Sequence, residues 1–222
     1  MRARDLNRFL KDMGWRSSPV AQPGTPRSPV KEVIVGDDRL AALANSAADC
    51  TLCRLSEKRQ KVVFGEGDPH AAVMFIGEGP GAEEDRSGRP FVGQAGQLLE
   101  RMLFAIGLRR DQVYITNIVK CRPPANRDPK EDEVAPCAPY LDQQIELIAP
   151  SVLVALGKPA SHRLTGTTKP ISALRGRWAS YKGVPLMPIF HPAYLLRTPS
   201  AKREAWEDLK KIKQRLESTE GG

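Results

Sequence analysis

The sequence predicts an α/β fold, with a parallel sheet that carries helices on both faces. Four apolar runs have the length and composition of strands, and each is continuous rather than alternating with polar residues. Helical patterns lie between these runs. Continuous apolar strands that alternate with helices are typical of parallel sheets buried on both faces. The chain has 222 residues, of which 41% are hydrophobic, so it can form one such domain with additional segments.

The chain is expected to divide into an extension, a domain and a tail. An apolar pattern with helical spacing runs from Leu6 to Met13, and a stretch rich in Pro, Ser and Gly follows it. We therefore predict an N-terminal extension and flexible linker at residues 1–40, a globular domain at residues 41–217 and a flexible tail at residues 218–222. The helix of the extension is a candidate contact for a replication or repair partner.

The globular domain is expected to alternate strands with helices. Its strands are predicted at residues 71–77, 113–119, 151–157 and 184–191. Its helices are predicted at residues 94–106, 131–148, 158–164 and 201–216. Sites in such folds gather at the carboxyl ends of the strands. Those ends carry the segments GEGPG, NIVKC, LGK and FHPAYLL, which we expect to converge on one crevice.

The net charge of +8 favours an anionic partner such as nucleic acid, although the same charge also serves solubility. No apolar run approaches the roughly 20 residues that a membrane span requires. The N-terminus contains Arg2, Arg4 and Asp5 but lacks the apolar core of a secretory signal. We therefore expect a cytoplasmic monomer without a membrane segment.

Four cysteines have a spacing that fits a metal site. Cys50 and Cys53 form a C-x2-C pair, and Cys121 and Cys137 follow much later in the chain. Two thiolates on one turn and two from a distant loop provide four ligands, either for zinc or for a [4Fe–4S] cluster. The second pair is not another C-x2-C turn, which disfavours an ordinary zinc ribbon, but the spacing leaves both metals open. Four unliganded core thiols are the remaining alternative, since disulfides are not expected in a reducing compartment.

The segment GEGPGAEEDRSGRPFVGQAG at residues 77–96 is rich in glycine but does not fit a phosphate loop. It matches neither the P-loop nor the G-x-G-x-x-G pattern, and Pro80 lacks the N–H group that would face a phosphate. The acids at residues 83–85 would repel phosphate. Glycines allow a ligand to approach the backbone closely, and Phe91 offers a flat face. These features predict a pocket for an uncharged planar heterocycle; alternatively, Phe91 is a core residue beside a surface turn.

Two further strand ends carry side chains suited to such a ligand. Asn117 presents an amide edge that can pair with the ring N–H and carbonyl of a pyrimidine. His191, directly before Pro192, can donate a hydrogen bond to a developing oxyanion. Several basic residues near the strand ends are candidates for phosphate contacts, namely Lys120, Arg122, Arg127, Lys158, Arg175, Arg177 and Arg197.

Three segments and the four cysteines resemble the family 4 (iron–sulfur) uracil-DNA glycosylases. The segments are GEGPGAEEDRSGRPFVGQAG, NIVKCRPPANRDP and HPAYLLR, and the resemblance covers about residues 42–215. It implies a three-layer α/β/α sandwich with a four-stranded parallel sheet and a [4Fe–4S] cluster rather than zinc. It also implies a DNA repair enzyme that hydrolyses the N-glycosidic bond of deoxyuridine in single- or double-stranded DNA, releasing uracil and leaving an abasic site.

The resemblance implies a role for each residue at the strand ends. Phe91 would stack on the flipped uracil, Asn117 would read its N3 and O4 edge, and His191 would hydrogen-bond O2 as that atom gains charge. Glu78 and Gly79 would lie beside O2 and the attacking water. Other branches of the superfamily place Asp or Asn after the glutamate, so the glycine here implies that a strong general base is absent.

The remaining implied roles concern selectivity, DNA and the cluster. Glu84 would crowd the C5 position of the base and so disfavour thymine. Leu195, Leu196 and Arg197 would form a loop that enters the duplex where the base leaves. Four thiolates would hold the cluster, namely those of Cys50, Cys53, Cys121 and Cys137.

Two other functional classes and one related branch of the superfamily are less consistent with the sequence. A non-catalytic DNA-binding or redox-sensing module of the same fold is the main alternative. An NTP-dependent enzyme would need a phosphate loop that the glycine-rich segment does not provide. A related branch forms a covalent DNA adduct through a histidine in an inserted basic loop, and the segment RPPANRDPKEDE after Cys121 contains no histidine.

Overall fold

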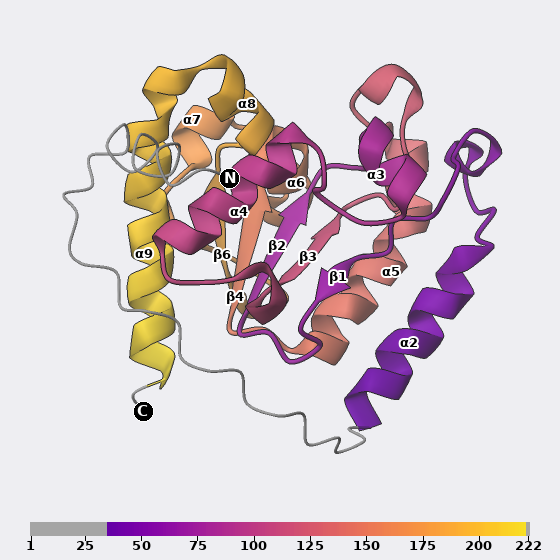
Figure 1. The fold of residues 1–222 in the computed structure, drawn as a ribbon, viewed down its shortest axis with the longest axis horizontal. Coiled ribbons are helices and arrows are strands. Elements are labelled where there is room, and N and C mark those ends of the chain that lie inside the picture. Colours follow the sequence, from indigo (N-terminus) through magenta and orange to yellow (C-terminus); the bar gives the residue numbers. More distant parts are fainter. Residues whose placement is uncertain (1–34, 221–222) are drawn as a thin grey trace.

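A six-stranded mixed sheet forms the middle layer of the computed structural model, which describes residues 35–220 (Figure 1). The strand order is β1-β3-β2-β4-β6-β5. The strands are β1 (Glu66–Gly67), β2 (Val73–Gly77), β3 (Tyr114–Asn117), β4 (Val152–Leu156), β5 (Ala179–Tyr181) and β6 (Val184–Ile189). The helix and linker predicted within residues 1–34 lie outside the described residues.

The four central strands are parallel, as the sequence predicts. Phe75 of β2 pairs with Ile115 of β3 on one side and with Val154 of β4 on the other, and β4 pairs in parallel with β6. Strands β1 and β5 add one short antiparallel strand to each edge. These edge strands could not be predicted, because two and three residues are too few for a periodic pattern.

Helices cover both faces of the sheet. They are α2 (Val35–Ala48), α3 (Ala82–Ser87), α4 (Gln94–Ala105), α5 (Glu131–Ile148), α6 (Gly157–Thr165), α7 (Ile171–Leu174), α8 (Pro192–Arg197) and α9 (Lys202–Glu220). Figure 1 shows α9 on one side of the sheet and α5 with α2 on the other. The four predicted helices correspond to α4, α5, α6 and α9, with α5 at the predicted bounds. Within the described residues, no helix is both long and apolar enough to cross a membrane.

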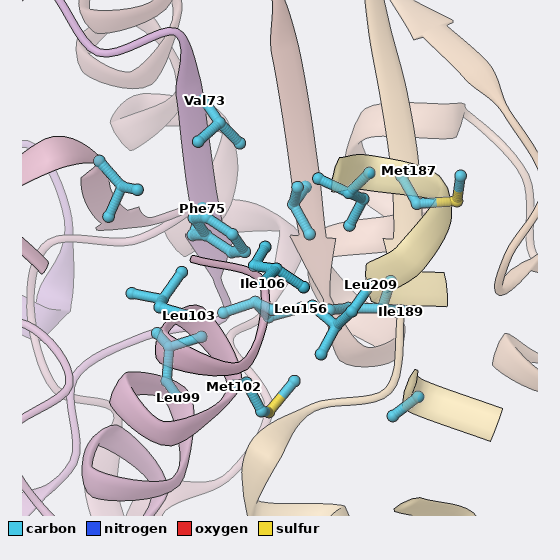
Figure 2. Packing of buried hydrophobic residues seen from close by; sticks show 14 of the residues in the cluster. Val73, Phe75, Leu99, Met102, Leu103, Ile106, Leu156, Met187, Ile189 and Leu209 are labelled. Atoms are coloured by element: carbon cyan, nitrogen blue, oxygen red, sulfur yellow. The ribbon is translucent and has the colours of Figure 1, made fainter. Parts of the chain in front are cut away.

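Alternate residues of each central strand enter two separate cores, which explains why the strands are apolar throughout. Val73 and Phe75 point to the core under α4 and α9, where they join Leu103 and Leu209 (Figure 2). Met74 and its alternate neighbours point to the opposite core under α5 and α6. Successive strand residues face opposite sides of a sheet, so both faces must be apolar when both are covered.

Helix α2 begins at Val35, before the predicted domain boundary at residue 41, and packs against α5. Its buried side chains are Leu40, Leu43 and Ala47. The last part of the predicted linker therefore belongs to a packed helix.

Candidate active site

A cavity of about 560 Å³ opens at the carboxyl ends of the parallel strands. The sequence predicted that these ends would converge, and most of the predicted site residues do line this cavity. They are Glu78, Gly79, Glu84, Phe91, Asn117, His191 and Arg197. The cavity also contains residues that the sequence analysis did not assign to a site, including Asp128, Phe190 and Tyr194.

Phe91 is held in an uncommon backbone conformation at the cavity wall. Its φ of +49° lies in the left-handed region, which costs a residue other than glycine about 1–3 kcal/mol. Arg110 stabilises this turn, because its Nη1 donates to the Phe91 carbonyl at 3.0 Å. Gly96 allows the turn to close, since a Cβ there would lie 1.9 Å from the same carbonyl oxygen. The GRPFVGQAG segment thus fixes the ring of Phe91, which is 6% exposed.

Gly77 provides the space in which Phe91 and Asn117 meet. A Cβ at Gly77 would lie 2.4 Å from Oδ1 of Asn117 and 2.6 Å from the nearest ring carbon of Phe91. The last residue of β2 must therefore be glycine if the amide and the ring are to keep these positions. The glycine acts here by the absence of a side chain.

Asn117 ends β3 with its side chain almost completely buried, at 1% exposure. Its Oδ1 has no hydrogen-bond partner among the described residues. Leaving a buried acceptor unpaired costs about 1–3 kcal/mol, so this atom is poised to accept a hydrogen bond from a ligand. The backbone of Asn117 is held by the ammonium group of Lys120, which donates to the carbonyl oxygen at 2.9 Å.

Lys120 belongs to a buried polar network behind Asn117. Its Nζ donates to Thr116 Oγ1 at 2.6 Å and to Gln144 Oε1 at 2.5 Å. Burial lowers the pKa of Lys120 to about 7. The network fixes the end of β3 behind Asn117. The sequence predicts Lys120 as a candidate phosphate contact, and its burial contradicts this prediction.

His191 is held as a neutral hydrogen-bond donor. The backbone N–H of Ala193 donates to its Nδ1 at 3.1 Å, so the ring proton of the neutral form lies on Nε2. Burial lowers the pKa of His191 to about 4, and the charge of Arg197 acts in the same direction. The His191 and Phe91 rings lie with centroids 5.7 Å apart. Gly157 leaves the space that the His191 side chain occupies, because a Cβ at this glycine would lie only 2.8 Å from the histidine Cβ.

Glu84 lines the cavity and also connects two of its loops. One carboxylate oxygen accepts the N–H groups of Val92 and Gly93, both at 2.9 Å, and the other accepts from Gly81 at 3.1 Å. The carboxylate thereby joins the start of α3 to the loop that carries Phe91. This organising role was not apparent from the sequence, because backbone donors leave no residue pattern.

Glu78 follows β2 and is half-buried in the cavity. The pKa of Glu78 is raised to about 7, first by burial and then by the charge of Asp128 and a hydrogen bond to it, whereas the charge of Lys158 opposes the shift. Asp128 lies between β3 and α5 and remains exposed. The segment ANRDP offered no signal for this contact, since a loop side chain is placed by tertiary structure.

The predicted duplex-entering loop at residues 195–197 requires a correction. These residues form the end of helix α8, and Leu195 is buried in the core with 1% exposure. Leu195 therefore supports α8 and is not available to contact DNA in this conformation. Leu196 is exposed, as is Tyr194, whose ring lies 4.9 Å from that of Phe190.

The four cysteines surround a second, smaller cavity, away from the first. Cys50 and Cys53 precede the 3₁₀ helix η1 (Arg54–Glu57), Cys121 follows β3, and Cys137 lies in α5. None of the four forms a disulfide with another described residue. Within the described part of the chain, no three Cys, His, Asp or Glu side chains form a group that fits a single metal ion.

Hydrogen-bond donors face the cysteine sulfurs. Arg59 donates from Nη1 to Cys121 Sγ at 3.4 Å and to the Cys50 carbonyl oxygen at 2.6 Å. The backbone N–H of Lys120 donates to Cys137 Sγ at 3.4 Å. Burial raises the pKa of Cys121 to about 11 and also raises that of Cys137.

Comparisons with known proteins agree on one family. The family model of the uracil DNA glycosylase superfamily matches residues 64–210. The type-4 uracil-DNA glycosylase of Sulfurisphaera tokodaii is 44% identical over 80% of this chain and 84% of that protein. The type-4 enzyme of Thermotoga maritima is 45% identical over 80% of this chain and 94% of its own length. A type-5 uracil-DNA glycosylase of Pyrobaculum aerophilum is 36% identical over 58% of this chain and 64% of that protein.

Proposed function

Because this chain belongs to the type-4 uracil-DNA glycosylases and removes uracil from DNA, we propose that the cavity at the ends of the parallel strands receives the flipped uracil base. The observation that carries this proposal is the unpaired, buried Oδ1 of Asn117 beside the Phe91 ring. Family membership also favours the enzyme over a non-catalytic module of the same fold.

Asn117 is proposed to select uracil by its hydrogen-bonding edge. Its Oδ1 accepts from uracil N3–H, and its Nδ2 donates to O4. Cytosine lacks the N3 proton and carries an amino group at C4, so cytosine would place acceptor against acceptor and donor against donor. A buried site built for one hydrogen-bonding pattern strongly rejects the other, because its polar groups then stay unpaired.

Phe91 and Glu84 are proposed to complete base recognition. Stacking of a base on an aromatic ring contributes about 1–3 kcal/mol, which offsets much of the few kcal/mol needed to extrude the base. The Glu84 carboxylate lines the same cavity and is fixed by three backbone N–H groups. A carboxylate held in this way leaves little space for the C5 methyl group of thymine.

His191 is proposed to stabilise the leaving base. As the bond between uracil N1 and C1′ breaks, its electron pair moves to the base and negative charge develops on O2. The neutral imidazole can donate its Nε2–H to this oxygen, and an oriented donor of this kind contributes about 10²–10³ in rate. Glu78 and Gly79 are proposed to lie beside the water that attacks C1′.

The exposed part of α8 is proposed to face the DNA. Leu196 is exposed on this helix, and Arg197, the next residue, lines the cavity. Leu195 is withdrawn from this role because it is buried. Arg197 brings positive charge to the side at which the phosphates of a flipped nucleotide would pass.

The four cysteines are proposed to bind a [4Fe–4S] cluster. A zinc ion needs all four sulfurs at about 2.3 Å from one point, whereas in a cluster each thiolate binds a different iron. Sulfurs that surround a common cavity without converging on one point therefore support the cluster. The cluster would connect three parts of the chain: the C-x2-C turn, the segment that follows β3, and helix α5.

The metal content of the protein tests this assignment. Protein purified without oxygen should contain iron; colourless protein with zinc and no iron would contradict this assignment.

Strand cleavage at abasic sites tests the proposed function directly. A labelled oligonucleotide with one uracil, single- or double-stranded, is incubated with the protein and treated with alkali, beside a thymine-containing control. We expect breaks at uracil only, and a large loss of rate in the His191→Ala variant. Tight binding without strand breaks would instead support a non-catalytic DNA-binding protein.

A further inference from the structure

We propose that Asp128 is a second acidic group of the active centre, which forms one carboxyl pair with Glu78 and acts on the attacking water through that pair. The inference rests on the proposed function, because it assigns the group that receives the proton of the water in the same cavity. It adds a residue to the active centre that neither the sequence motifs nor the names of the relatives assign.

The geometry brings the two carboxyl groups together from distant segments. Glu78 follows β2, Asp128 lies between β3 and α5, and both line the cavity that also contains Asn117 and His191. Asp128 is near enough to Glu78 to raise the pKa of Glu78 by its charge and to share a side-chain hydrogen bond with it. Two carboxyl groups can do this only when one of them carries a proton, because an ionised carboxylate is an acceptor alone.

A fixed loop presents Asp128 to Glu78. Arg127 donates to both carboxylate oxygens of Glu133 at 2.7 and 2.6 Å, and to the carbonyl oxygen of Asp128 at 2.9 Å. Glu133 is fully buried and also accepts from the backbone N–H of Lys130 at 2.8 Å. The charge of Arg127 is thus balanced by Glu133, which leaves the negative charge of Asp128 to act on Glu78.

The electrostatics of the cavity keep a proton on the pair near neutral pH. Burial raises the pKa of Glu78 to about 7, with Asp128 as the next cause, and the ammonium group of Lys158 opposes this. The other charged groups on the cavity wall are Glu84, which accepts three backbone N–H groups, and Arg127 and Arg197; His191 is neutral. Like charges that share a site raise the pKa of one of them.

The chemical step follows from this arrangement. The bond between C1′ and uracil N1 breaks with its electron pair on uracil, and the oxygen of water forms a bond to C1′. The fully ionised pair accepts the proton that this water loses, and the pair ends with one shared proton. Two negative charges near C1′ also stabilise the positive charge that develops on the sugar. The rate should therefore rise with pH as the pair loses its proton.

Single-turnover rates on uracil-containing oligonucleotide between pH 5 and pH 9 test the proposal. We expect the wild-type rate to rise up to about pH 7 and then level off. Asp128→Asn should lower the midpoint of the pH–rate profile by about 0.5–1 pH unit. The ratio of the variant rate to the wild-type rate should therefore be about three- to tenfold higher at pH 5.5 than at pH 8.5.

Glu78→Gln should abolish the rise of the rate with pH. As a matched control, Asp111→Asn makes the same charge change on an exposed residue outside the cavity and should leave the midpoint in place.

The outcomes separate this inference from the proposed function. If wild-type protein releases no uracil, the proposed function fails. If it releases uracil while Asp128→Asn keeps the wild-type midpoint, only the inference about Asp128 fails. NMR of wild-type protein with ¹³C-labelled glutamate carboxyl groups gives a measurement that needs no variant: one signal should titrate near pH 7, and its absence would overturn the proposal.

Discussion

Gly77→Ala should slow uracil excision strongly while leaving the fold intact. The added Cβ would lie 2.4 Å from Asn117 Oδ1 and 2.6 Å from the Phe91 ring. Non-bonded heavy atoms are most stable at about 3.5 Å or more, so the amide, the ring or both must move by about 1 Å. The backbone of this residue is that of an ordinary strand, so the substitution acts through the displaced side chains alone.

The magnitude follows from the position of the two side chains. A displacement of about 1 Å in groups that orient a substrate can cost about 10²-fold in rate. Overpacking of a well-packed region costs about 1–3 kcal/mol of stability, which lowers the melting temperature without unfolding the protein. We therefore expect kcat/KM for uracil excision to fall by about 10²-fold, with the far-ultraviolet circular dichroism spectrum unchanged.

Gly93→Ala provides the matched control. Its Cβ would meet only ordinary contacts, the nearest at 3.4 Å to the Glu84 carboxylate, although this glycine lies in the same loop as Phe91. In single-turnover assays of uracil excision, we therefore expect Gly93→Ala to react at about the wild-type rate and Gly77→Ala to react far more slowly. A Gly77→Ala enzyme with kcat/KM within twofold of wild type would refute the assigned positions of Phe91 and Asn117.

Three further predictions concern recognition, catalysis and DNA binding. Asn117→Asp should reduce the preference for uracil over cytosine, measured with matched oligonucleotides; unchanged selectivity would contradict its role in reading the base. His191→Ala should lower kcat by about 10²–10³-fold, and a change confined to KM would argue against an oxyanion donor. Because the net charge is +8, DNA affinity should fall by about tenfold or more between ~50 and ~200 mM salt in a binding titration. A flat salt response would mean that basic residues do not contact the phosphates.

The periodic part of the fold could be predicted from the sequence, because periodicity reports burial. The run that contains Val73 and Phe75 is apolar throughout since its residues enter two cores, and the same holds for the other central strands. Helices α3 and α8 were not predicted, since six residues are too short for a periodic signal. For the same reason Leu195 was read as part of a loop although it is buried.

The candidate site could be predicted only where a strand end or a family segment marked it. Asn117 ends β3 and His191 follows the end of β6 by two residues, so their convergence followed from the parallel order of these strands. The contact of Asp128 with Glu78 and the three backbone hydrogen bonds of Glu84 depend on how loops fold back, and no local pattern encodes them. The unpaired Oδ1 of Asn117 is likewise a property of the assembled cavity.

The packing of α2 on α5 has a consequence for how the protein is made. On the ribosome, the first of these helices emerges long before the second, and α5, the helix that α2 packs against in the described part of the chain, follows only later. At about 5–20 residues per second, this interval lasts on the order of ten seconds. During that time the nascent chain exposes an apolar stripe, and this stripe is where a chaperone would be expected to hold it.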